Sequence, residues 1–240
     1  MLGQPIGMYA SLTTESLLSP TLNNICSWAR LYCSSENIVY GGDNRVSSWG
    51  DNSGNSVTAS SSGSARPSNQ NNSLPSGGSS IFFDGNTQYL DLTSTSGTEK
   101  IIFVLANHKK SSASDTYMLG ATSGNILFGY DSAGSGIRLY GSSSGYFSGP
   151  DYQTVARNQW KLYELTISSG GLANLFVNGV QDATTVSSGA VNISRIGAFA
   201  AGRSFLGNIA VVAIRESLSF GTNDRANIRQ AIANWAGISL

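Results

Sequence analysis

Short runs of apolar and aromatic residues recur along most of this chain, and turn residues separate them. This spacing restricts the fold more than any other feature, because closely spaced short runs are typical of an all-β sandwich or barrel. The expected strands are residues 81–83, 88–92, 101–106, 117–119, 126–130, 137–140, 160–167, 174–177, 191–196 and 209–214. Residues 21–240 are therefore predicted to form one β-sandwich domain, since sandwiches of this length commonly fold as a unit.

Residues typical of turns separate these expected strands. Asn178-Gly179 follows the run 174–177, and an Asn-Gly pair is typical of a type I′ hairpin because both central residues take positive φ. Asp84-Gly85-Asn86 is interpreted as a similar hairpin turn. Residues 51–80 are rich in Ser, Asn and Gly and contain two prolines, so we predict one long connection there without strands.

One helix is expected, at the carboxyl end of the chain. Its apolar positions repeat at i, i+3, i+4 and i+7, in Ile228, Ala231, Ile232 and Trp235. The end residues suit a helix as well, with Thr222 or Asn223 as the N-cap, Asp224 in the first turn and Gly237 as the stop. Such an apolar stripe favours a lid packed on its own sandwich over a surface for a partner.

The amino-terminal segment 1–20 carries scattered apolar residues without a sustained period, and it is predicted to be an arm. The arm could be an edge strand of its own sandwich or a segment that docks on a neighbouring subunit. The first cationic residue is Arg30, so we expect no ordinary export signal. The longest apolar run, 209–214, is far too short for a membrane span, and no membrane insertion is expected.

The charge balance and the cysteine content argue against nucleic acid, an anionic surface, a disulfide and zinc as features of this protein. Basic and acidic residues number 14 each, so no long-range field favours nucleic acid or an anionic surface. Cys26 and Cys33 are seven residues apart, which is beyond disulfide reach along a regular strand or helix. Both are predicted to be thiols unless the chain turns between them, which would allow a disulfide. Two cysteines and one histidine make a poor zinc set. No cofactor is expected.

The residues that catalysis would need are missing. Glycoside hydrolysis requires two carboxylates close together, whereas each glutamate is isolated in the sequence: Glu15, Glu36, Glu99, Glu164 and Glu216. The single histidine, His108, lies beside two lysines and is predicted to be a solvated loop residue. The chain is therefore predicted not to be an enzyme.

A calcium site is a minor alternative to a metal-free domain. The carboxylates of Asp43, Asp51, Asp84 and Asp91 could bind the ion together with backbone carbonyls, although aspartates are common in the turns of any β protein.

A Gly/Ser-rich segment, residues 140–152, contains four aromatic side chains that could stack on sugar rings. These candidate ligand-binding residues are Tyr140, Tyr146, Phe147 and Tyr152. The alternative is that their rings pack over a sandwich edge.

Several motifs together resemble the laminin-G/concanavalin-like jelly-roll domains found in bacteriophage structural proteins and bacterial surface proteins. They are Trp28-Ala-Arg-Leu-Tyr, Val46-Ser-Ser-Trp-Gly-Asp-Asn-Ser-Gly, Arg66-Pro67, Phe83-Asp-Gly, Trp160, the 174–179 hairpin, Ile196-Gly197 and Phe205-Leu-Gly-Asn-Ile. The resemblance implies two antiparallel sheets packed face to face, with Trp49 and Phe83 as core anchors. It also implies a strand at the Trp28 segment, which by itself could equally be helical. Val211 stands where many relatives carry an acid.

The resemblance leads to two functional hypotheses. The first is a non-enzymatic bacteriophage virion protein, a capsid decoration or tail-fibre component assembled in the host cytoplasm, with other virion proteins and further copies of itself as partners. The alternative is a lectin-like carbohydrate-binding module, for which glycans of the host surface would be partners. Laminarinase-type glucanases share this fold but carry an acid cluster that is missing here, and fold alone does not fix function.

Overall fold

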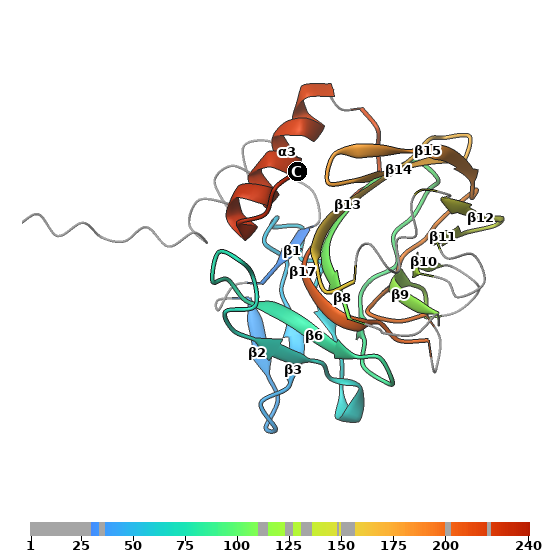
Figure 1. Ribbon diagram of the computed structural model, residues 1–240. Helices are drawn as coiled ribbons and strands as arrows, with labels where there is room; N and C mark the ends of the chain where they lie inside the picture. The colour runs from blue at the N-terminus through green and yellow to red at the C-terminus, as the bar shows by residue number, and fades with distance from the viewer. Residues whose placement is uncertain are drawn as a thin grey trace, which may run out of the picture.

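The computed structural model describes residues 30–33, 37–109, 115–122, 127–130, 136–147, 149, 157–199, 203–219 and 222–240 (Figure 1). These residues form two sheets and one carboxyl-terminal helix, and every pairing of neighbouring strands is antiparallel. The all-β class, the two antiparallel sheets and the carboxyl-terminal helix predicted from the sequence are confirmed.

The first sheet, sheet A, contains the longest strands. In spatial order they are β15 (Val180–Ser187), β14 (Leu172–Val177), β13 (Trp160–Ile167), β8 (Lys100–His108), β17 (Leu206–Arg215), β6 (Ser80–Asp84) and β5 (Ser68–Gln70). Strand β1 (Arg30–Tyr32) also pairs with β17, so the segment that begins at Trp28 contains a strand. Trp28 itself lies outside the described residues.

The second sheet, sheet B, is built from shorter strands. Their order is β12 (Ser144–Phe147), β11 (Ile137–Tyr140), β10 (Leu127–Tyr130), β9 (Thr116–Gly120), β16 (Arg195–Ile196), β7 (Leu90–Asp91), β4 (Ala59–Ser60), β3 (Val46–Trp49) and β2 (Ile38–Tyr40). Strands β16 and β7 are shorter than the runs 191–196 and 88–92 that the sequence indicated.

The main core lies between the two sheets. Trp49 of β3 and Phe83 of β6 are both fully buried in it, in agreement with their expected role as core anchors. Gly197 shows how closely this core is packed, because a Cβ at that position would lie 2.2 Å from the Phe83 ring. Its φ of +81° is also a conformation that favours glycine. Burial of large side chains from both sheets is what holds the sandwich together.

Helix α3 (Thr222–Ala236) covers the outer face of sheet A (Figure 1). Its buried side chains Ile228, Ile232 and Trp235 pack on outward-facing residues of β8, β13 and β17. Gly237, with φ of +70°, ends the helix, and the Ile238 amide donates to the Ala233 carbonyl at 3.0 Å. The predicted lid is confirmed.

A buried carboxylate attaches this helix to the sheet. Glu164 of β13 is 0% exposed, and its two oxygens accept hydrogen bonds from Arg225 and Arg229 of α3. The two guanidinium groups also lie over the ring of Phe176, with Cζ 4.8 and 5.9 Å from its centroid. The sequence pattern marked Glu164 as isolated, but the i, i+4 spacing of the two arginines places both above it.

Two turn predictions have different outcomes. Asn178 and Gly179 have φ of 48° and 80° and connect β14 to β15, so the hairpin is confirmed. The turn at 84–86 does not close a hairpin, because β6 belongs to sheet A and the next strand, β7, to sheet B. This turn instead leads the chain from sheet A to sheet B. The Asp84 carboxylate stabilises it by accepting hydrogen bonds from the backbone amides of Asn86 and Thr87.

The predicted strand-free connection at 51–80 is wrong. It contains β4, the 3₁₀ helix η1 (Gly63–Ala65) and β5, and it contributes a strand to each sheet. Its polar residues form strands because they pair with existing neighbours: Trp49 with Ala59, and Ser68 with Phe82. Backbone hydrogen bonds to a neighbouring strand therefore stabilise the extended conformation in segments whose side-chain pattern does not predict a strand.

The prediction of a solvated His108 is also wrong. His108 is the last residue of β8, is 2% exposed, and stacks on Tyr130 with ring centroids 4.3 Å apart. The strand extends past its apolar run because Asn107 and His108 pair with β17 at Asn208 and Gly207. The hydroxyl of Tyr130 is hydrogen-bonded to that of Tyr163, and burial raises the pKa of Tyr163 well above its usual value.

Some sequence predictions fall on other parts of the chain. The arm, residues 1–20, and Cys26 lie outside the described residues. Cys33 is buried, and its Sγ lies 4.0 Å from the carbonyl oxygen of Ile209. In the described part of the chain, no helix has the length and apolar character needed to cross a bilayer.

Truncating either core anchor should destabilise the domain strongly. Trp49→Ala and Phe83→Ala are each expected to lower the free energy of unfolding by about 3–5 kcal/mol, because a large buried ring is lost and the cavity relaxes only in part. Urea denaturation measures the effect, with Val180→Ala as the control, since Val180 is 72% exposed. Unfolding midpoints close to that of the parent would contradict the core assignment.

Removing only the two arginines around Glu164 should lower the free energy of unfolding more than removing the glutamate and both arginines together. The double variant Arg225→Met/Arg229→Met leaves a buried carboxylate without its cations, and it is expected to lose about 3–5 kcal/mol of unfolding free energy. Adding Glu164→Leu removes that charge, so the triple variant should regain most of the loss. Chemical denaturation at neutral pH compares the two, and equal stability of the double and triple variants would contradict a coupled cluster.

Candidate functional site

The outer faces of the two sheets differ in what covers them. Helix α3 covers the outer face of sheet A, whereas β9 to β12 of sheet B lie on the other side of the molecule from the helix (Figure 1). The outer face of sheet B is therefore where partly exposed aromatic side chains can meet a ligand.

The register of β11 and β12 decides which side chains reach this face. Ile137 pairs with Phe147, and both are fully buried in the core between the sheets. The next pair, Arg138 with Tyr146, must point the opposite way, because side chains alternate along a strand. Tyr140, two residues after Arg138, shares that outward side, and all three side chains are half-buried.

Arg138 lies between the two tyrosines. Its Cζ is 5.4 Å from the centroid of the Tyr140 ring and 5.3 Å from that of Tyr146. Both distances are within the range of a cation–π interaction, which holds each ring in place against the guanidinium. The result is a row of two rings and one cation across neighbouring strands.

Two further aromatic residues extend this row toward the middle of the sheet. Tyr117 of β9 and Phe199 are buried against each other, edge to face, with centroids 5.9 Å apart, and Tyr140 packs on them. Gly129 lies between β9 and β11, where a Cβ would be 2.5 Å from Cα of Tyr117. We call the set Tyr117, Arg138, Tyr140, Tyr146 and Phe199 the tyrosine face.

The same side of sheet B carries a second pairing of guanidinium and ring. Arg195 of β16 binds Asp91 of β7 with both ends of its fork, at 2.6 and 3.1 Å, and its Cζ lies 3.7 Å from the centroid of Tyr89. Because Asp91 holds the guanidinium, the Tyr89 ring is covered on one side. This cluster adds polar groups to the sheet surface, and it leaves Tyr140 and Tyr146 as the rings suited to contact a ligand.

The four predicted ligand-binding aromatics separate into three groups. Tyr140 and Tyr146 come together on the tyrosine face. Phe147 is 0% exposed and lies in the core, so the prediction of a ligand-binding ring is wrong for this residue. The Gly/Ser-rich segment contains strand β12, and the alternation of side chains along it turns Phe147 inward. Tyr152 lies outside the described residues. Sequence reasoning missed Arg138, although the alternation of apolar and polar residues in 137–140 could have placed it beside Tyr140.

The aspartates considered for calcium are engaged separately. Asp43 binds Arg66 at 3.0 Å, Asp51 accepts from Ser53 and Val57, and Asp84 and Asp91 have the partners given above. Among the described residues, no group of three or more His, Cys, Asp or Glu side chains is arranged to hold a metal ion.

Comparison with protein families identifies the fold class. The family model described as the concanavalin A-like lectin/glucanases superfamily matches residues 84–217, which is more than half of the chain. The chain belongs to this superfamily. Its two sheets are thus a concanavalin-like jelly roll, as the sequence motifs implied.

Several solved structures share this fold at low sequence identity. One is domain 4 of a GH43 extracellular arabinanase from Geobacillus stearothermophilus in complex with arabinotriose, with 14% identity, a TM-score of 0.55, and coverage of 85% of this chain and 96% of that one. Another is the botulinum neurotoxin serotype D ligand-binding domain in complex with N-acetylneuraminic acid, with 12% identity, a TM-score of 0.60, and coverage of 95% and 56%.

A third similar structure is the sialidase of Trypanosoma rangeli in complex with sialic acid, with 15% identity and a TM-score of 0.58. The match covers 92% of this chain but 37% of the sialidase, so the present chain corresponds to a part of that enzyme. The search of curated protein sequences returned no match.

Proposed function

We propose that this domain is a lectin-like carbohydrate-binding module, and that it binds glycans through the tyrosine face. The observation that carries the proposal is the placement of two half-buried tyrosine rings on either side of Arg138, on the outer side of sheet B. Rings held in fixed positions give contact area to a ligand with little loss of side-chain entropy.

The chemistry of the face suits sugars. A tyrosine ring offers an apolar surface to the C–H side of a sugar, and its hydroxyl group can donate to or accept from sugar hydroxyls. Arg138 adds N–H donors between the rings. A sheet surface with rings on neighbouring strands suits an extended glycan chain better than a small apolar molecule, which needs an enclosing pocket.

The solved structures support this proposal over a purely structural role. The arabinanase domain and the neurotoxin domain were each solved with a carbohydrate, and both share the fold of this chain. At 14% and 12% identity the likeness concerns fold, so the ligand class of this chain rests on its own tyrosine face.

The bacteriophage virion role expected from the sequence stays a prediction, as do its localisation and its homo-oligomeric assembly. Neither the matching family nor the structures compared above are described as virion proteins, and the lectin-like alternative has the better support. The two roles are compatible, because a glycan-binding domain displayed on a particle could attach that particle to a cell surface.

We also propose that the domain binds glycans without cleaving them. Hydrolysis needs two carboxylates at opposite sides of the scissile bond. Glu164 is buried under α3 with two arginines, and Asp91 is bound by Arg195, so each is engaged in the structure of the domain. The charged group in contact with the rings of Tyr140 and Tyr146, among the described residues, is the guanidinium of Arg138.

Alanine variants of the tyrosine face should lose binding while the domain stays folded. Tyr140→Ala and Tyr146→Ala are each expected to weaken binding to a glycan identified on an array by about tenfold or more, because each removes a stacking ring at the centre of the contact. Isothermal titration calorimetry measures the change, with thermal melting as a check on folding. Val180→Ala, on the edge strand of sheet A, is the matched control.

The outcome that contradicts the proposal is also measurable. Unchanged glycan affinity in the double variant Tyr140→Ala/Tyr146→Ala would show that the glycan binds elsewhere. A complete absence of glycan binding by the parent protein, across arrays of plant, bacterial and animal glycans, would contradict the lectin-like function itself.

No hydrolysis is expected from the purified domain on polysaccharides that it binds. Release of reducing ends from arabinan, β-glucan and sialylated substrates should stay at the level of a heat-denatured control, because paired carboxylates are missing from the sequence pattern. Reproducible release that disappears on substitution of a single acidic residue would overturn this prediction.

A further inference from the structure

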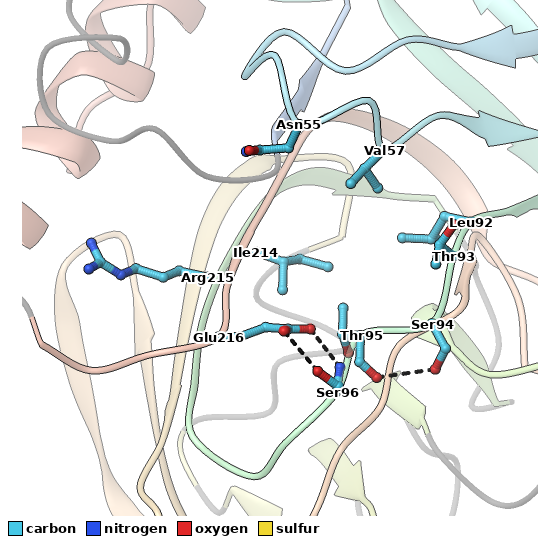
Figure 2. A pocket seen from close by; sticks show the side chains of 10 residues that line it. All are labelled: Asn55, Val57, Leu92, Thr93, Ser94, Thr95, Ser96, Ile214, Arg215 and Glu216. Atoms are coloured by element: carbon cyan, nitrogen blue, oxygen red, sulfur yellow. Dashed lines mark hydrogen bonds between the residues drawn. The ribbon is translucent and has the colours of Figure 1, made fainter.

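A pocket of about 410 Å³ lies apart from the tyrosine face, on the side of the molecule where β17 ends (Figure 2). Three segments form its walls. They are the loop after β3, with Asn55 and Val57; the segment after β7, residues 92–96; and the end of β17 with its next residue, 214–216. Because β17 belongs to sheet A and β3 and β7 to sheet B, the pocket opens between the two sheets.

The inner wall of the pocket is apolar. Ile214 points into the space, and Val57 and Leu92 face it from the other two segments (Figure 2). Ile214 is 5% exposed and belongs to the main core, and Leu92 packs against the same core. The wall is therefore an extension of the hydrophobic core that a ligand with an apolar side could cover.

The rim of the pocket is polar and mostly uncharged. It carries the amide of Asn55 and the hydroxyl groups of residues 93–96, together with the carboxylate of Glu216. Glu216 is held in place, since its two oxygens accept from the backbone amide of Ser96 at 2.5 Å and from its hydroxyl at 2.9 Å (Figure 2). Each carboxylate oxygen keeps a further lone pair for a ligand donor.

Two cations lie near the Glu216 carboxylate. The first is Lys100, whose ammonium group donates to the carbonyls of Ser96 and Gly97 at 2.5 Å each. Burial lowers the pKa of Lys100, and the nearby Glu216 carboxylate opposes that shift. The second is Arg215, whose side chain extends away from Val57 and Leu92 (Figure 2) and whose guanidinium donates to the carbonyl and hydroxyl oxygens of Ser219 at 3.3 and 3.4 Å. Among the described lining residues Glu216 carries the one carboxylate, so neither a metal ion nor an organic cation is favoured here.

We propose that this pocket binds a single neutral sugar unit, as a second carbohydrate site. A sugar ring has an apolar C–H side for the wall of Val57, Leu92 and Ile214, and hydroxyl groups for Glu216, Asn55 and the Ser/Thr rim. The proposed ligand class rests on the carbohydrate-binding function proposed above. The location rests on the pocket alone, and the size falls within the range of ordinary small-ligand sites.

The chemistry of the pocket also predicts which sugars it takes. Glu216 accepts hydrogen bonds from neutral hydroxyl groups, but it repels a carboxylate or sulfate brought to the same rim. Neutral units such as glucose, galactose, mannose or arabinose are therefore expected, and acidic units such as N-acetylneuraminic acid are not.

The test is amide NMR of the isotope-labelled domain during titration with methyl glycosides of these four neutral sugars and with N-acetylneuraminic acid. At least one neutral glycoside is expected to cause saturable shifts in residues 92–96 and 214–216. Glu216→Ala, which removes the acceptor, and Val57→Trp, which fills the space, should each weaken that binding about tenfold or abolish it. Val180→Ala, at an exposed position on the edge strand of sheet A, should leave it unchanged.

The outcomes separate this inference from the proposed function. Shifts confined to residues of the tyrosine face would overturn the pocket site and leave the lectin-like function intact. Pocket shifts with N-acetylneuraminic acid as strong as those with the neutral glycosides would overturn the neutral class. Failure of every glycoside to shift residues 92–96 and 214–216 overturns the site, whether or not glycan polymers bind to the tyrosine face.

Discussion

Burial of β8 and β17 on both faces is the constraint on which the rest of the structure depends. One side of these strands packs on sheet B in the main core, and the other side packs on α3. Sheet A alone would expose Phe103, Leu105 and Val211 to water, so the fold requires a cover, and the buried Glu164 with its two arginines fixes where that cover lies. Since the helix covers sheet A, the outer side of sheet B is left for ligands.

Sequence reasoning predicted the elements whose signal is local. The run 160–167 became β13 with the same bounds, and the apolar stripe at 228–235 became the buried side of α3. It failed where backbone pairing with another strand, and not the local side-chain pattern, decides the conformation. Strands β4, β5 and β12 are rich in Ser, Asn, Gln and Gly, and β8 extends through His108 because β17 is beside it. Cross-strand pairing of this kind cannot be read from neighbouring residues.

The candidate site was predictable in part for the same reason. The aromatic composition of residues 140–152 drew attention to Tyr140 and Tyr146, yet only the register of β11 with β12 separates them from Phe147. A shift of one residue would turn Phe147 outward and Tyr146 into the core. Tyr117 and Phe199 join the tyrosine face from segments that are far away in sequence, so their contribution depends on the topology of the sheet.

The tyrosine face and the pocket differ in chemistry, and this difference bears on how one domain could hold a glycan. The face offers rings and a guanidinium on an extended sheet surface, so its contacts with a glycan would spread along several sugar units. The pocket offers an apolar wall and a fixed carboxylate in about 410 Å³, so its contacts would converge on one unit. Two weak sites of this kind on one rigid sandwich would bind a branched or multivalent glycan more tightly than either site alone, because the second contact forms at a high effective concentration. Stability of the sandwich then matters directly for affinity, since the core between sheets A and B keeps the two sites at a fixed separation.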